Sequence, residues 1–96
     1  MVAEDDDEMS HVLDFLLRRE GFHVRIVRDG RDALRAIAAE DPCDLVVMDV
    51  MMPFASGLQV VRELRRNSNW ALVPVLMVSG KGAENDVVAV HSGIPR

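Results

Sequence analysis

Residues 45–53 read Leu45-Val46-Val47-Met48-Asp49-Val50-Met51-Met52-Pro53, an apolar run interrupted by one carboxylate and ended by a proline. A run this short, with neighbouring valines, is typical of a strand buried on both faces, as in a parallel sheet. Pro53 cannot donate a ladder hydrogen bond and biases Met52 away from helix, so we expect the strand to end near Met51. Asp49 then lies near the carboxyl end of a central strand, where open α/β sheets bind their ligands.

Size and composition limit the possible functions. The chain has 96 residues, enough for one domain, and 49% of them are hydrophobic. The net charge of -5 argues against nucleic-acid binding, which normally needs a basic face. No apolar run approaches the roughly 20 residues that span a bilayer. The one cysteine, Cys43, cannot form an internal disulfide, and a reducing cytoplasmic location fits this composition.

The rest of the chain alternates between the two hydrophobic periodicities. Strands are expected at residues 1–3, 22–27, 45–51 and 73–78, and helices at 9–17, 33–38, 58–64 and, weakly, 86–90. We expect no further strand after these. Strands that alternate with helices indicate a parallel sheet with right-handed crossovers.

Polar residues follow three of the predicted strands. The first strand ends at Glu4 and Asp5, the third at Asp49 and the fourth at Ser79. If these strands are neighbours, the carboxylates and the hydroxyl meet in one crevice. Clustered carboxylates repel one another unless a cation neutralises them. Mg²⁺, which prefers oxygen ligands and often binds phosphate oxygens as well, is the natural cation for such a site.

Each of these residues also has a simpler interpretation. Asp5 and Glu8 have the spacing of a capping box at the start of the first helix. Asp49 could be paired with a basic side chain, and Ser79 could be an ordinary loop serine. Other catalytic motifs are absent from the sequence, including a G-x-x-x-x-G-K-[ST] phosphate loop, a G-x-G-x-x-G dinucleotide motif and a D-x-D phosphatase motif at Asp49.

Taken in chain order, the motifs resemble those of the receiver domain of two-component response regulators. The matching segments are residues 2–6, 21–22, 29–34, 44–53, 57–58 and 73–80. The resemblance implies a flavodoxin-like, three-layer α/β/α fold with a parallel sheet in the strand order 2-1-3-4. It therefore predicts one response-regulatory domain over residues 1–96, incomplete at its C-terminus because the fifth strand and helix of the family are missing.

The same resemblance implies roles for individual residues. Asp49 matches the phosphoacceptor, which takes a phosphoryl group from a histidine kinase or phosphotransfer protein. Asp5 would ligate Mg²⁺ directly, Glu4 through water, and the backbone carbonyl of Met51 would complete the metal site. Ser79 matches the switch hydroxyl that bonds a phosphoryl oxygen. A receiver is not an enzyme in the usual sense, because it carries out only its own phosphorylation.

The sequence departs from the family pattern at its end. The family's lysine, which is followed by proline after the fifth strand, has no counterpart, and Lys81 lies on a different loop. The chain is therefore interpreted either as a fragment of a longer regulator or as a naturally shortened receiver. An uncovered fourth strand would favour a homodimer or other self-association.

Two functions remain open from the sequence. The first is a phosphoacceptor in two-component phosphorelay signalling, with Mg²⁺ as cofactor and a sensor histidine kinase or phosphotransfer protein as partner. The second is a degenerate receiver that acts only as a protein-interaction module, without phosphotransfer. In either case we expect no direct contact with nucleic acid or membrane.

Overall fold

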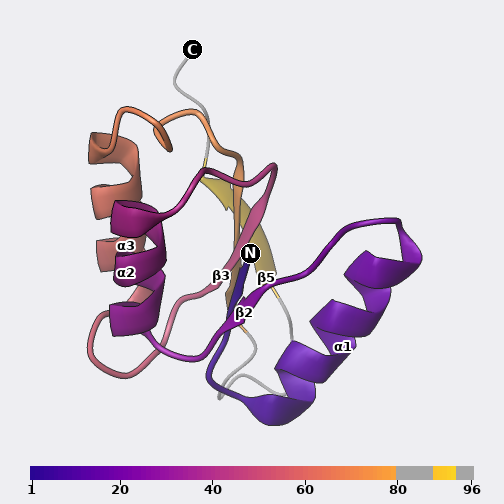
Figure 1. Ribbon diagram of the computed structural model, residues 1–96. Coiled ribbons are helices and arrows are strands. Elements are labelled where there is room, and N and C mark those ends of the chain that lie inside the picture. Colours follow the sequence, from indigo (N-terminus) through magenta and orange to yellow (C-terminus); the bar gives the residue numbers. More distant parts are fainter. Residues whose placement is uncertain (80–87, 93–96) are drawn as a thin grey trace.

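A five-stranded sheet in the order β2-β1-β3-β4-β5 forms the centre of the computed structural model of the chain (Figure 1). The structure describes residues 1–79 and the backbone of residues 88–92, with side chains described for residues 1–78. The strands are β1 (Val2–Ala3), β2 (Ile26–Val27), β3 (Val46–Asp49), β4 (Val75–Ser79) and β5 (Val88–Ser92), and the helices are α1 (Asp7–Arg19), α2 (Gly30–Ala39) and α3 (Gly57–Arg66).

The first four strands are parallel, which confirms the predicted sheet and its order 2-1-3-4. Helices α2 and α3 cover one face of this sheet and α1 lies on the other, so the domain has three layers (Figure 1). The central strand ends at Asp49, two residues before the end that Pro53 suggested. The strand expected over residues 22–27 is paired only at Ile26 and Val27.

Strand β5 corrects the sequence analysis. A weak helix was expected to begin at Asp86 and no strand to follow, but Val88–Ser92 pairs with β4 as an antiparallel strand. Val88 and Val90 are β-branched and favour a strand. The edge of β4 offers unpaired backbone groups with which a strand can pair. Because β5 covers β4, the predicted route to self-association through an open β4 edge is not present in this arrangement.

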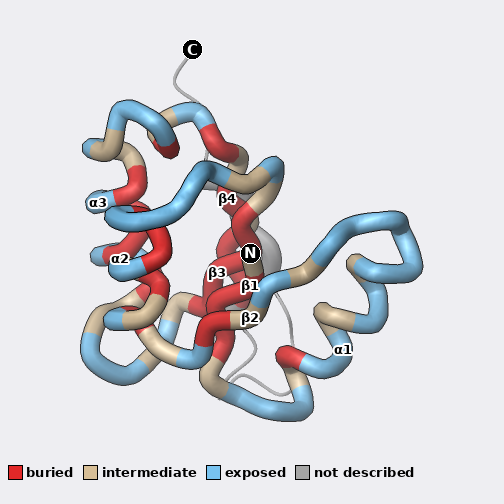
Figure 2. Tube along the Cα trace, viewed as in Figure 1, coloured by how far each residue is buried: buried red, intermediate tan, exposed pale blue. Residues whose placement is uncertain are grey.

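The larger core lies between the sheet and α2 and α3. Val46 and Met48 of β3 point to this side, where they pack with Ile37, Val60 and Leu64. Trp70 closes the same core, and its Nε1–H donates to the carbonyl oxygen of Glu40 at 3.2 Å. The red segments of Figure 2 accordingly gather in the strands and on the inner sides of α2 and α3.

The core under α1 is smaller. It contains Val2, Val47 and Val78 from the sheet, against which Leu13 and Leu17 of α1 pack. Three other apolar side chains of α1, Val12, Phe15 and Leu16, are exposed. Helix α1 ends at Arg19 with Glu20 as its C-cap, and Gly21 follows with a φ of 94°, the left-handed conformation of a C′ glycine. Within the described chain, no helix combines the length and the apolar character that a membrane crossing requires.

Candidate metal and phosphoacceptor site

The alternation of side chains along β1 and β3 brings two carboxylates to one side of the sheet. Val47 faces the α1 side, so Asp49, two residues further on, faces the same side. In the same way Glu4 lies two residues beyond Val2, which also faces α1. Val2 pairs with Val47 in the sheet, so Glu4 and Asp49 leave neighbouring strands at the same edge.

The three carboxylates predicted from the sequence do meet. One oxygen from each of Glu4, Asp5 and Asp49 lies within 4.8 Å of the others. Asp49 is 2% exposed and Glu4 is 3% exposed, while Asp5 is half-buried at the mouth of the cluster. We call these three residues the acidic cluster.

Backbone contacts hold the acidic cluster in place. The backbone N–H of Glu4 donates to the carbonyl of Val27 at 3.0 Å, which fixes Glu4 against β2. A carboxylate oxygen of Glu4 accepts from the backbone N–H of Asp6 at 3.0 Å. A carboxylate oxygen of Asp49 accepts from the backbone N–H of Met51 at 3.3 Å. These bonds orient two buried carboxylates before any ligand arrives.

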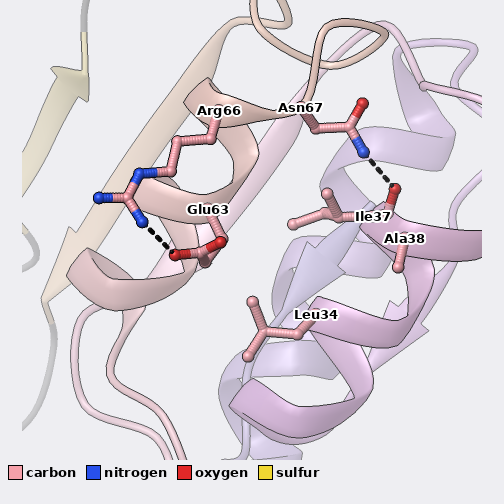
Figure 3. A pocket seen from close by; sticks show the side chains of 6 residues that line it. All are labelled: Leu34, Ile37, Ala38, Glu63, Arg66 and Asn67. Carbon is pink, nitrogen blue, oxygen red and sulfur yellow. Dashed lines mark hydrogen bonds and ion pairs between the residues drawn. The ribbon is translucent and has the colours of Figure 1, made fainter.

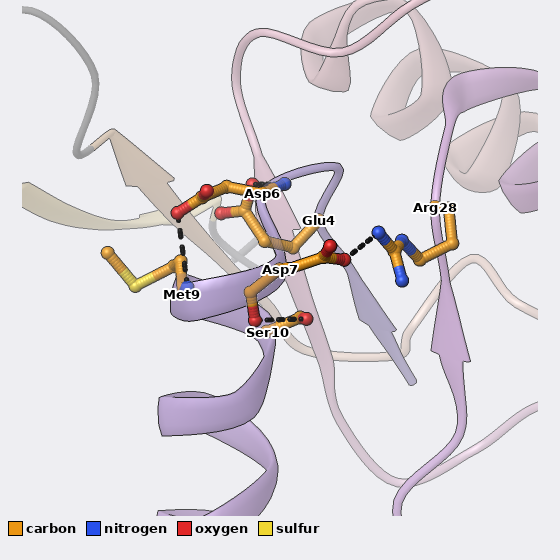
Figure 4. Close-up of polar contacts among 6 residues, drawn as sticks. All are labelled: Glu4, Asp6, Asp7, Met9, Ser10 and Arg28. Carbon is orange, nitrogen blue, oxygen red and sulfur yellow. Dashed lines mark hydrogen bonds and ion pairs between the residues drawn. The ribbon is translucent and has the colours of Figure 1, made fainter.

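Residues 4–8 form an acidic run after β1, and its members make different contacts (Figure 4). The predicted capping box between Asp5 and Glu8 is wrong, because Asp6 is the N-cap of α1 and accepts from the backbone N–H of Met9 at 3.1 Å. Asp7 forms an ion pair with Arg28 of the segment after β2. Asp5 is therefore not used as the helix cap, and its carboxylate lies in the acidic cluster.

Close packing beneath Asp49 fixes the strand end. The backbone N–H of Gly57 donates to the carbonyl of Val50 at 2.9 Å. A Cβ atom at Gly57 would lie 2.1 Å from the backbone oxygen of Asp49, so only glycine fits here. Ser56 caps α3 next to this contact and forms a reciprocal capping box with Gln59. This close approach could not be predicted, because the sequence does not show which backbone a glycine meets in the fold.

The remaining predicted site residues are placed only in part. Met51 is exposed in the loop after β3, and its role as a carbonyl ligand stays a prediction. Ser79 ends β4, one residue beyond Val78, which pairs with Asp49. Its backbone is thus at the same edge of the sheet, whereas its hydroxyl group, Gly80 and Lys81 lie outside the residues whose side chains are described.

The donor set of the acidic cluster suits Mg²⁺. Three carboxylates supply hard oxygen ligands, which magnesium prefers, and among the residues whose side chains are described no softer sulfur or imidazole ligand joins them. The fold and this cluster together define a class of protein, namely a doubly wound α/β domain with an acidic cation site at the carboxyl edge of its sheet.

The sequence matches the family described as "Response regulator receiver domain" over residues 1–93. The chain belongs to this family, which places it in two-component signal transduction.

Solved structures agree with this family. The receiver domain of a sensor histidine kinase from Pseudomonas aeruginosa PAO1, with a magnesium ion coordinated in its active-site cleft, is 28% identical with a TM-score of 0.77 over 88% of this chain and 69% of that one. The receiver domain of a signal transduction histidine kinase from Syntrophus aciditrophicus is 26% identical with a TM-score of 0.76, over 86% of this chain and 62% of that one. The response regulator TrrA from Thermotoga maritima, in complex with Mg(2+)-BeF, is 26% identical with a TM-score of 0.75, over 84% and 68%. The chain thus spans between 62% and 69% of the length of these three structures.

Proposed function

We propose that Asp49 accepts a phosphoryl group from a histidine kinase or a phosphotransfer protein, with Mg²⁺ held by Glu4, Asp5, Asp49 and the backbone carbonyl of Met51. The observation that carries this proposal is the acidic cluster at the end of β3. Similar receiver domains from P. aeruginosa and T. maritima have magnesium in their structures, which supports the choice of metal. We place this reaction in the cytoplasm, in keeping with the single cysteine of the chain.

The chemistry follows from the position of Asp49. An oxygen of its carboxylate attacks the phosphorus atom of the donor phosphohistidine, and a new O–P bond forms while the P–N bond breaks. The electron pair of that bond leaves with the imidazole nitrogen of the donor. The product is an acyl phosphate on Asp49, a mixed anhydride that water can hydrolyse. The domain thus performs only its own phosphorylation and acts as a signalling component rather than as an enzyme on other molecules.

The chain's contribution is to orient the nucleophile and to provide carboxylates that can hold the metal. The N–H group of Met51 holds one carboxylate oxygen of Asp49, so the nucleophile has a fixed direction. Phosphoryl transfer depends mainly on such positioning and on neutralising the charge of the transferred oxygens. Glu4, Asp5 and Asp49 would hold Mg²⁺, which would supply that neutralising charge. We assign to the Ser79 hydroxyl the bond to a phosphoryl oxygen that reports the modified state, supported by the position of Ser79 at this edge of the sheet.

Replacing Asp5 by asparagine should weaken Mg²⁺ binding by at least about tenfold, because one anionic ligand is lost from the acidic cluster. Titration calorimetry with MgCl₂ measures the change. Asp6→Asn is the matched control, since it removes the same charge from the same acidic run while asparagine still caps α1. Equal weakening by the two variants would mean that net charge, and not ligation by Asp5, attracts the metal.

A further inference from the structure

Two adjacent hollows follow the outer side of α2. One, of about 460 Å³, lies between α2 and the loop after β3 and is lined by Arg31, Leu34, Arg35, Ala38, Phe54 and Ala55. The other, of about 470 Å³, lies between α2 and α3 and is lined by Leu34, Ile37, Ala38, Glu63, Arg66 and Asn67 (Figure 3). Leu34 and Ala38 line both, so the two hollows form one continuous surface, here called the α2–α3 groove. No member of the acidic cluster lines it.

Phe54, which lines the groove, has an unusual backbone conformation and an exposed side chain. Its φ of 73° is a left-handed conformation that a bulky residue rarely adopts, and its side chain is 71% exposed. Such strain persists only where the surroundings enforce it, and it gathers at functional positions. Two hydrogen bonds hold the loop at Phe54 in this conformation, because the N–H of Gly30 and the N–H of Ala55 both donate to the carbonyl of Pro53, at 3.0 Å and 2.9 Å. The backbone of Phe54 is thus strained, and its exposed ring contributes little to the core of this chain.

Both charged residues that line the hollow at Phe54 are arginines. The guanidinium group of Arg31 lies 4.1 Å from the centroid of the Phe54 ring. Arg35 reaches the same hollow and has one ion pair, to Asp32 of its own helix, in which the arginine side chain is 70% exposed. Among the described residues that line this first hollow there is no carboxylate. A cationic, apolar hollow therefore occurs on a chain whose net charge is -5.

The second hollow is different in charge. Arg66 is paired with Glu63 at 3.1 Å, and the side-chain amide of Asn67 donates to the carbonyl of Ile37 at 3.0 Å (Figure 3). The charged and amide side chains of this second hollow therefore already have partners within the chain. The half near Phe54 is therefore lined by arginines without a carboxylate among the described lining residues, whereas the half near Ile37 adds apolar surface.

We propose that the α2–α3 groove binds an acidic, amphipathic segment of another protein. An apolar side chain of this segment would lie on Leu34, Ala38 and the Phe54 ring, and its carboxylates would pair with Arg31 and Arg35. A second copy of this chain is a poorer occupant, because acidic residues that it could offer are already engaged, with Asp6 capping α1 and Asp7 paired with Arg28.

Binding is tested on the full chain by amide NMR with two designed helical peptides. Both carry leucine at every i and i+4 position of one face, and the other positions are glutamate in the first peptide and lysine in the second. We expect the glutamate peptide to shift the amides of Leu34, Ala38 and Ala55, and to bind more tightly than the lysine peptide. The net charge of the chain alone would favour the lysine peptide, so tighter binding of that peptide would overturn the proposal. Shifts confined to other surfaces, or no shift with either peptide, would overturn it as well.

Two variants locate the interaction. Arg31→Glu combined with Arg35→Glu should weaken the glutamate peptide by at least about tenfold, as loss of a central contact does. Arg62→Glu, an exposed α3 substitution outside both hollows, should have little effect and is the matched control per charge. If Arg62→Glu, which changes the net charge by half as much as the double variant, weakens binding to the same extent per unit of charge, net charge alone explains the effect and the assignment is overturned.

Phe54→Asn separates binding from folding. Asparagine adopts the left-handed conformation readily, so the melting temperature should be unchanged or higher, while the glutamate peptide binds about tenfold more weakly. A clear fall in melting temperature would show that Phe54 serves the core and would overturn the proposed role. Analytical ultracentrifugation covers the second-copy alternative, because self-association that Phe54→Asn abolishes would assign the groove to a copy of this chain instead.

Discussion

The Asp49→Asn protein is expected to take up no phosphoryl group from acetyl phosphate in the presence of Mg²⁺, whereas the unchanged chain gains one. The amide of asparagine is not a nucleophile towards phosphorus, and the change also removes one of the three carboxylates of the acidic cluster. Intact-protein mass spectrometry measures the added phosphoryl group. Hydroxylamine should remove it, as expected for an acyl phosphate.

Asp44→Asn is the control for this experiment. Asp44 is an exposed carboxylate just before β3, at the opposite edge of the sheet, and its replacement should leave phosphorylation unchanged. Undiminished phosphorylation of Asp49→Asn would contradict the assignment of the acceptor. If the unchanged chain is folded and binds Mg²⁺ but takes up no phosphoryl group, the alternative of a receiver that acts only as an interaction module is favoured.

The second large effect is expected at Gly57. In Gly57→Ala the new Cβ atom would lie 2.1 Å from the backbone oxygen of Asp49, and both groups belong to packed backbone that cannot simply rotate away. Overpacking of this kind typically costs up to about 3 kcal/mol, and we expect a loss of that order in the free energy of unfolding. Because the strand end must move, Mg²⁺ affinity should fall as well. Urea unfolding and calorimetry measure the two effects.

Gly21→Ala is the matched control for Gly57→Ala. A Cβ atom at Gly21 meets nothing within 4 Å. The loss in the free energy of unfolding therefore comes only from the φ of 94° and amounts to about 1 kcal/mol. Gly21 closes α1 far along the chain from Asp49, so Mg²⁺ affinity should be unchanged. If Gly57→Ala is no more damaging than Gly21→Ala, the close approach of Gly57 does not hold the acceptor strand in place.

The main features of the site could be predicted from the sequence because they depend on short-range patterns. The apolar run before Asp49 indicated a buried strand, and the alternation of strands and helices indicated a parallel sheet. Parallel strands share one carboxyl edge, so residues that follow separate strands, such as Asp5 and Asp49, were expected to meet. The structure confirms that meeting.

Other features depend on contacts that a linear sequence does not show. The sequence suggested Asp5 as the cap of α1, whereas Asp6 is the cap in the structure. Both aspartates are competent caps, and the path of the chain after β1 decides between them. The segment from Val88 became a strand because the edge of β4 was available for pairing. The left-handed backbone of Phe54 results from hydrogen bonds to Pro53 that only the folded loop creates.

Two-dimensional amide NMR of the chain, recorded before and after addition of Mg²⁺ and then of beryllofluoride, a phosphoryl mimic, tests the assignment of the phosphoacceptor site. We expect a dispersed spectrum in which Mg²⁺ shifts the amides around Asp5 and Asp49, and beryllofluoride adds shifts at Asp49 and Ser79. A dispersed spectrum that responds to neither addition would contradict a working phosphoacceptor site in this domain.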